Sequence, residues 1–293
     1  MGKLFKFSNK RLQIFFVDDD GYPIGLPLDL SIPDPNAVEA GETYHAYNLM
    51  GYVTATPAAR EVDTATDQAD GKNYGDIDMG ISSYGSIEIT LSMRDELAFE
   101  MIRRVTANTT VSSGARISSK NNTSLNPRNM GIIITDKVRD EDTGVIGYEH
   151  NVYNKGTFSV TQEAEGNQSG GVNPSPLTIT FKPVPSNRLA IYAMLYSALG
   201  LGVEEGVDTD SPISSPHQLT LSTFIKDGVA TTFTTKYKPT VAAATVGGVN
   251  VYTSEGTQGS LTSLTLAGLA TMSAVGTSGH RAVLAYATNF EPV

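Results

Sequence analysis

The chain contains no cysteine, no long apolar run and comparatively few basic residues. Without cysteine it cannot form disulfides, thiolate zinc sites, iron–sulfur clusters or a cysteine nucleophile. No stretch approaches the roughly 18 consecutive apolar residues of a membrane-spanning helix, so no membrane partner is expected. The 293 residues carry 21 Lys and Arg against 31 Asp and Glu, a net charge of −10. That balance disfavours a surface that grips nucleic acid, because such a surface is basic.

What the sequence does contain is a series of short runs with the period of β-strands. The 28 glycines and 14 prolines separate these runs. Apolar and polar residues alternate over residues 87–91, 158–161 and 177–181, which predicts strands with one buried face. Residues 131–135 are continuously apolar apart from Gly131 and Thr135, which predicts a strand buried on both faces. The chain is therefore expected to be mainly β.

Turn residues predict two hairpins, and two stretches look irregular. Asp142-Thr143-Gly144 fits a hairpin tip, and Lys226-Asp227-Gly228 is expected to join strands at 219–225 and 229–237. Residues 33–80 and 106–129 are rich in small and polar residues with little sustained alternation. We expect both to be long loops, which in compact domains tend to be functional.

One segment has the pattern of a helix instead. Ser92 can cap the N-terminus of a helix over residues 93–105, whose first turn is acidic. Apolar residues stand four and eight positions after Leu97, so one face of the helix is apolar and would pack on a sheet. Arg103 and Arg104 end the helix, where they complement its dipole. An ion pair to a neighbouring subunit is the alternative role for these two arginines.

The composition changes near residue 206. Residues 206–293 hold five acids and four bases, a net charge of −1, so the first 205 hold 26 acids and 17 bases, a net charge of −9. The junction at 208–216 is polar and contains two prolines, as linkers do. We therefore predict two domains, residues 1–205 and 206–293, with the second a small β-sandwich.

No motif predicts catalysis, a cofactor or a metal site. The four histidines are scattered, with no pair at metal-ligand spacing. Gly166 to Gly171 lacks the Lys-Ser/Thr of a phosphate-binding loop, and no nucleophile-elbow sequence occurs. The Asp18–Asp20 cluster fits a turn better than a calcium loop. The chain is therefore not expected to be an enzyme, to bind a cofactor or to hold a metal.

The order of these elements resembles a known family. Residues 84–92 running into 93–105, followed by 156–161 and 176–181, resemble the major tail tube protein of long-tailed (siphovirus-type) bacteriophages over about residues 1–200. The C-terminal part, through residues 229–234 and 282–286, resembles the Ig-like modules that phage structural proteins carry. This resemblance implies a β-sandwich or barrel tail-tube domain with one flanking α-helix, followed by a small Ig-like β-sandwich.

The resemblance also implies a function. Tail tube proteins form hexameric rings that stack into a tube through which DNA passes during ejection, without specific binding. The implied partners are further copies of the chain and other tail proteins, namely the tape measure, the terminator and the distal tail protein. The implied location is the virion, in the phage tail, after synthesis in the host cytoplasm.

A tube of this kind would need a wall that does not hold DNA. An acidic lumen repels phosphate, and the net charge of −9 in residues 1–205 is consistent with that. Alternation places Glu88 and Thr90 on the free face of their strand, and Glu163 is a further candidate for facing the lumen. Two other classes remain open: a capsid or baseplate decoration protein or cell-surface-binding adhesin, and an enzyme, for which the sequence shows no catalytic residues.

Overall fold

The computed structural model describes residues 4–17, 23, 39–49, 52–57, 61–69, 72–83, 85–91, 109–110, 116–117, 129–141, 144, 146–163, 177–184, 218–240, 251–253, 258–259, 261–272 and 278–293. Strands make up 74% of the described part, and no helix lies within it. The prediction that the chain is mainly β is therefore confirmed. The helix predicted at 93–105, with Arg103 and Arg104, lies outside the described residues.

The first sheet has seven antiparallel strands. A tight turn at Gly144, whose φ is +70° and whose N–H donates to the carbonyl of Asp140 at 2.9 Å, joins two of its central strands, as the turn residues predicted. In spatial order the strands are β3 (Tyr47–Asn48), β1 (Leu4–Phe16), β10 (Met130–Asp140), β11 (Ile146–Glu163), β12 (Leu177–Pro183), β7 (Ile87–Leu91) and β4 (Tyr52–Pro57).

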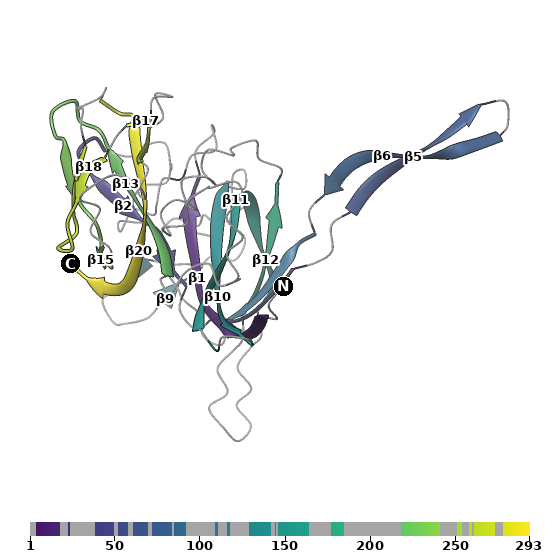
Figure 1. Ribbon diagram of the computed structural model, residues 1–293, viewed down its shortest axis with the longest axis horizontal. Coiled ribbons are helices and arrows are strands. Elements are labelled where there is room, and N and C mark those ends of the chain that lie inside the picture. The colour runs from purple at the N-terminus through teal and green to yellow at the C-terminus, as the bar shows by residue number, and fades with distance from the viewer. Residues whose placement is uncertain are drawn as a thin grey trace, which may run out of the picture.

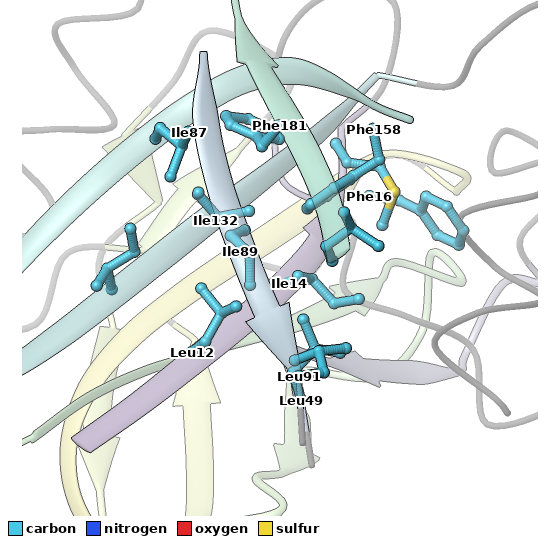
Figure 2. Packing of buried hydrophobic residues seen from close by; sticks show 13 residues of the cluster. Leu12, Ile14, Phe16, Leu49, Ile87, Ile89, Leu91, Ile132, Phe158 and Phe181 are labelled. Atoms are coloured by element: carbon cyan, nitrogen blue, oxygen red, sulfur yellow. The ribbon is translucent and has the colours of Figure 1, made fainter. Parts of the chain in front are cut away.

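One face of this sheet encloses the largest apolar cluster. On β7 the alternation is as predicted: Ile87, Ile89 and Leu91 are buried, Glu88 is exposed and Thr90 is half-buried. Figure 2 shows these isoleucines facing side chains from β1 and β12, so the sheet curls around its own core. The cluster comprises Leu12, Ile14, Phe16, Leu49, Ile87, Ile89, Leu91, Met130, Ile132, Ile134, Phe158, Ile179 and Phe181.

Two more sheets pack face to face in the C-terminal part. The larger joins β17 (Gln258–Gly259), β16 (Val251–Thr253), β20 (Arg281–Pro292), β13 (Gln218–Ile225) and β2 (Thr43–His45), with β15 (Tyr237–Pro239) also paired to β20. The smaller joins β14 (Thr232–Thr234), β19 (Leu269–Met272) and β18 (Leu261–Leu264). Phe224 and Phe233 stack between them with ring centroids 5.3 Å apart. Apolar side chains of the two sheets form one cluster between them.

The hairpin predicted across residues 226–228 is wrong. Strand β13 is hydrogen-bonded to β20 on one side and to β2 on the other, whereas β14 pairs with β19 in the opposite sheet. Asp227 Oδ1 accepts the N–H groups of Val229 and Ala230 at 2.8 and 2.7 Å, and Gly228 has a φ of +80°. This turn therefore carries the chain from the larger sheet to the smaller one.

Residues 12–16 of β1 and 130–136 of β10 are buried on both faces. Their second face, through Phe15, Val17 and Ile133, packs against the sheet that contains β13 and β20. The partners there are Leu219, Leu221, Val283 and Ala285. The continuous apolar run at 131–135 had predicted burial on both faces, and this prediction is confirmed.

A short segment near the N-terminus belongs to both sheets. Strand β2 pairs with β13, and β3, which follows it after one residue, pairs with β1. Ala46, between these strands, donates its N–H to the carbonyl of Leu221 at 3.1 Å. Leu49, after β3, donates its N–H to the carbonyl of Leu12 at 2.9 Å. The chain division at residue 206 stays a prediction, but the two parts share a core and this bridging segment, residues 43–49.

A long hairpin leaves the body of the molecule. Among the described strands, β5 (Glu61–Ala69) and β6 (Lys72–Ser83) pair only with each other, and they project outward (Figure 1). They continue the β4–β7 pair, whose last register is Pro57 opposite Ile87. The prediction of an irregular loop over 33–80 is therefore wrong for most of its length. We call residues 61–83 the arm. In the other stretch, 106–129, only β8 (Thr109–Thr110) and β9 (Arg116–Ile117) are described as strands.

The core of the curled sheet gives a first prediction. Replacing Ile89, which is fully buried, with alanine should lower the free energy of unfolding by about 2–5 kcal/mol, because it removes packed methyl groups and leaves a cavity. Glu88→Ala on the exposed side of the same strand should change it by less than about 0.5 kcal/mol. Urea denaturation of both variants measures the difference, and equal effects would contradict the alternation described here.

Candidate assembly surfaces

The half of the first sheet formed by β11, β12 and β7 leaves one face uncovered by the other described elements. Register aligns Glu88 with Thr180 and Ser159, and Thr90 with Thr178. Further along, Thr157 lies opposite Lys182, and the N–H of Val184 donates to the carbonyl of Lys155. All of these residues are exposed or half-buried. We call this set the polar face: Glu88, Thr90, Lys155, Thr157, Ser159, Thr178, Thr180, Lys182 and Val184.

The charge of the polar face is mixed. It carries one carboxylate, on Glu88, and two ammonium groups, on Lys155 and Lys182. Its remaining members are hydroxyl residues apart from Val184. Within the described part of the chain, neither lysine forms an ion pair. Lys182 occupies a polar position in the alternating run that begins at residue 177, so the pattern could have revealed it.

The three residues predicted to face a lumen do not all lie on the same face of the sheet. Glu88 and Thr90 lie on the polar face, as alternation predicted. A register shift between Val160 and Gln162 places Gln162 opposite Thr178, whereas Glu163 lies opposite Leu177 in the row of the buried Leu91. Bulges of this kind exchange the two faces of a strand and leave no mark in a period-two pattern. That any of these residues faces a lumen stays a prediction.

The arm is strongly acidic. It contains six acids and one base, Lys72, and so has a net charge of −5, which is half that of the whole chain. In the register of the hairpin, Asp76 lies opposite Thr66 and Asp78 opposite Thr64. The acids of the arm are Glu61, Asp63, Asp67, Asp70, Asp76 and Asp78.

Buried polar contacts fasten the bridging segment and β1 to the C-terminal sheet. The side chain of Gln13 donates to the carbonyl of Leu219 at 2.7 Å and accepts the hydroxyl of Thr220 at 2.9 Å. His45 Nδ1 lies 2.9 Å from the Ser222 hydroxyl. Together with the apolar cluster on that side, these bonds make the C-terminal sheet part of the body. No sequence pattern indicates these bonds, because the partners are more than 170 residues apart.

A carboxylate pair occurs on the neighbouring strands. Asp136 and Glu149 lie opposite each other, with Lys6 Nζ 3.6 Å from Asp136 Oδ2 and 2.6 Å from Glu149 Oε2. Burial raises the pKa of Asp136, and Lys6 opposes that rise. The ammonium group offsets the repulsion between two like charges directly across a strand pair. We interpret this trio as a structural ion cluster.

The described residues contain no group of three or more His, Asp or Glu that could hold a metal ion. None of the described segments forms a helix with the length and apolarity needed to cross a membrane. Comparison of the chain with protein-family models, with curated proteins and with solved structures finds no match.

The bridging segment gives a prediction of pH dependence. Burial, with a smaller effect of Lys236, lowers the pKa of His45 to about 4 from its ordinary 6.5. Below pH 6.5 His45 is protonated in the unfolded chain, whereas in the folded chain it stays neutral until the pH falls to about 4. The stability contributed by neutral His45 is therefore complete above pH 6.5 and is lost as the pH falls to about 4, by about 2–3 kcal/mol.

The measurement is urea unfolding of the wild type and of His45→Asn between pH 7.5 and 4. We expect the stability difference between the two proteins to shrink as the pH falls, because asparagine cannot titrate. A difference that stays constant over this range would contradict the lowered pKa.

Proposed function

We propose that this protein is a structural subunit that assembles with copies of itself, and that its assembly is the tail tube of a long-tailed bacteriophage. The observation that carries the self-assembly is the arm. An isolated two-stranded hairpin is marginal in water, and strands of 9 and 12 residues that pair with no other described strand leave both outer edges without a strand partner in the part of the chain that the structure describes. Such an element is stabilised when another chain covers it.

The position of the arm favours a ring or a filament. The arm projects away from the body (Figure 1), and the surface that receives it on another copy is a different part of the chain. When the receiving copy places its own arm on a third copy, the contact is head-to-tail, and it repeats until it closes into a ring or continues as a helix. A reciprocal exchange of arms between two copies would instead give a closed dimer. Six subunits per ring and a channel for DNA follow from the resemblance of residues 1–200 to tail tube proteins.

The polar face provides a candidate channel wall. Around Glu88 and Thr90 it presents hydroxyl groups and a carboxylate, which offer little to hold a phosphate backbone. The C-terminal β-sandwich would be the Ig-like module implied by the same resemblance, fastened to the body through the bridging segment. A lumen position for Glu163 and intersubunit ion pairs of Arg103 and Arg104 belong to this proposal as predictions.

Self-association of the purified chain tests the proposal. Negative-stain microscopy and light scattering over increasing protein concentration should show rings or tubes with a central channel. A protein that stays monomeric or trimeric at all concentrations would contradict the proposal and favour the decoration or adhesin role.

A shortened arm tests the observation on which the proposal rests. Replacing residues 64–78 by an Asn-Gly turn keeps a hairpin but removes most of its length. We expect this variant to remain monomeric at concentrations where the wild type assembles, with an unchanged unfolding midpoint, because among the described strands the arm pairs only with itself. Assembly equal to the wild type would show that the arm is not the contact.

A further inference from the structure

Two lysines lie next to each other at one end of the polar face. Lys182 lies opposite Thr157, so Lys155, two residues before Thr157 on β11, is its diagonal neighbour across the strand pair. Diagonal neighbours in a sheet are about 7–8 Å apart, close enough for like charges to repel. Glu88, opposite Thr180, is the diagonal neighbour of Lys182 on the other side, and neither lysine forms an ion pair among the side chains that the structure describes. This end of the polar face, which we call the lysine end, therefore carries two positive charges against one negative charge on that face.

The lysine end lies where the arm leaves the sheet. Phe181, the residue before Lys182, is opposite Ile87, the first residue of β7, and the arm ends a few residues before Ile87. The arm itself extends outward from this point (Figure 1). Its distal part therefore points away from the lysines of its own chain, and only another chain can bring carboxylates of a distal arm onto them.

The arm carries a pair of acids with a matching separation. Asp76 and Asp78 are two residues apart in β6, within a stretch of unbroken register that pairs them with Thr66 and Thr64. Residues two apart in a strand share one face and lie about 7 Å apart. The separation of these two acids thus equals that of diagonal neighbours such as Lys155 and Lys182. The face of the arm with Asp76 and Asp78 is also the face with Thr64 and Thr66, which resembles the hydroxyl-rich surroundings of the lysines.

We propose that the arm of one subunit docks on the lysine end of a second copy, with Asp76 and Asp78 paired to Lys155 and Lys182. This inference deepens the proposed self-assembly and rests on it, because the partner is a second copy of the chain. Charge complementarity identifies the occupant: an arm of net charge −5 meets two lysines beside which the polar face places a single carboxylate, that of Glu88.

Nucleic acid fits the lysine end less well. A duplex is held by many basic groups along its phosphates, and the polar face supplies two, with Glu88 one row further along the sheet. An arm docked at the lysine end leaves the rows of Glu88 and Thr90 uncovered. The docking site and the candidate channel wall therefore occupy different parts of the same face.

Complementary charge reversals test this contact in the full chain. The first variant, Lys155→Glu with Lys182→Glu, has a normal arm and a reversed docking site. The second, Asp76→Lys with Asp78→Lys, has a reversed arm and a normal docking site. Each alone should raise the concentration needed for assembly at least tenfold, because every contact then places like charges together. Mixed in equal amounts they should assemble within about threefold of the wild-type concentration, because opposite charges meet at every contact between unlike subunits.

A matched control uses acids on the other face of the arm. Asp63→Lys with Asp67→Lys makes the same change in net charge, and these residues share the opposite side of β5 from Thr64 and Thr66. This variant should assemble within about threefold of the wild type. An equal defect in the control, or a mixture that fails to assemble, would overturn the proposed pairing.

Sedimentation of the mixture separates this inference from the proposed function. If the wild type forms rings or tubes and the variant Lys155→Glu with Lys182→Glu assembles equally well, the docking inference fails while the proposed function stands. The docking inference also fails if that variant assembles normally and differs from the wild type only by a loss of DNA binding. If the chain forms no ring or tube but the two reversed variants form a complex that neither forms alone, the docking inference stands and the tube proposal fails.

Discussion

The fold depends on one constraint: residues 12–16 of β1 and 130–136 of β10 are buried on both faces and must be covered twice. The sheet can cover one face by curling, which brings β7 and β12 over Leu12, Ile14 and Ile132. It cannot cover the other, so Phe15 and Ile133 require a second layer, which β13 and β20 provide. The bridging segment follows from this arrangement, because it runs along the seam between the two layers and hydrogen-bonds to both.

The other half of the same sheet is under no such constraint. Strands β11, β12 and β7 bury one face in the curled core and leave the other to threonine, serine, lysine and Glu88. The sheet thus has one half, around β1 and β10, that is covered on both faces, and another half, formed by β11, β12 and β7, that is covered on one face only. The arm grows from the free half, since β4 and β7 lead directly into β5 and β6. Candidate contacts with other subunits therefore lie on the half of the sheet that the fold itself leaves uncovered.

The sequence could predict the parts of this fold in which a pattern reports burial. Alternation located β7 and placed Glu88 and Thr90 on its open side, and the continuous apolar run located β10. The arm was missed because residues 61–83 show little alternation of apolar and polar residues, and their pairing is visible only in the register of β5 with β6. The turn after β13 was misread because turn residues mark a change of direction but not the sheet to which the chain returns. That Lys155 and Lys182 are neighbours is visible only in the register of β11 with β12. That Glu163 does not lie on the face of Glu88 is visible only from the bulge between Val160 and Gln162.

The bridging segment has a consequence for the order in which the chain is made. Its strand β2 finds its partner at residues 222–224, and the outer face of β1 is covered by residues near 283–285. While the ribosome is still translating, β1 and β10 can meet, but their second apolar face stays open until residues 283–285 have emerged. Contacts this distant along the chain slow folding, and a nascent chain with an exposed apolar face is prone to aggregate. Completion of the body, and with it a subunit competent to join others, therefore waits until that segment has been synthesised.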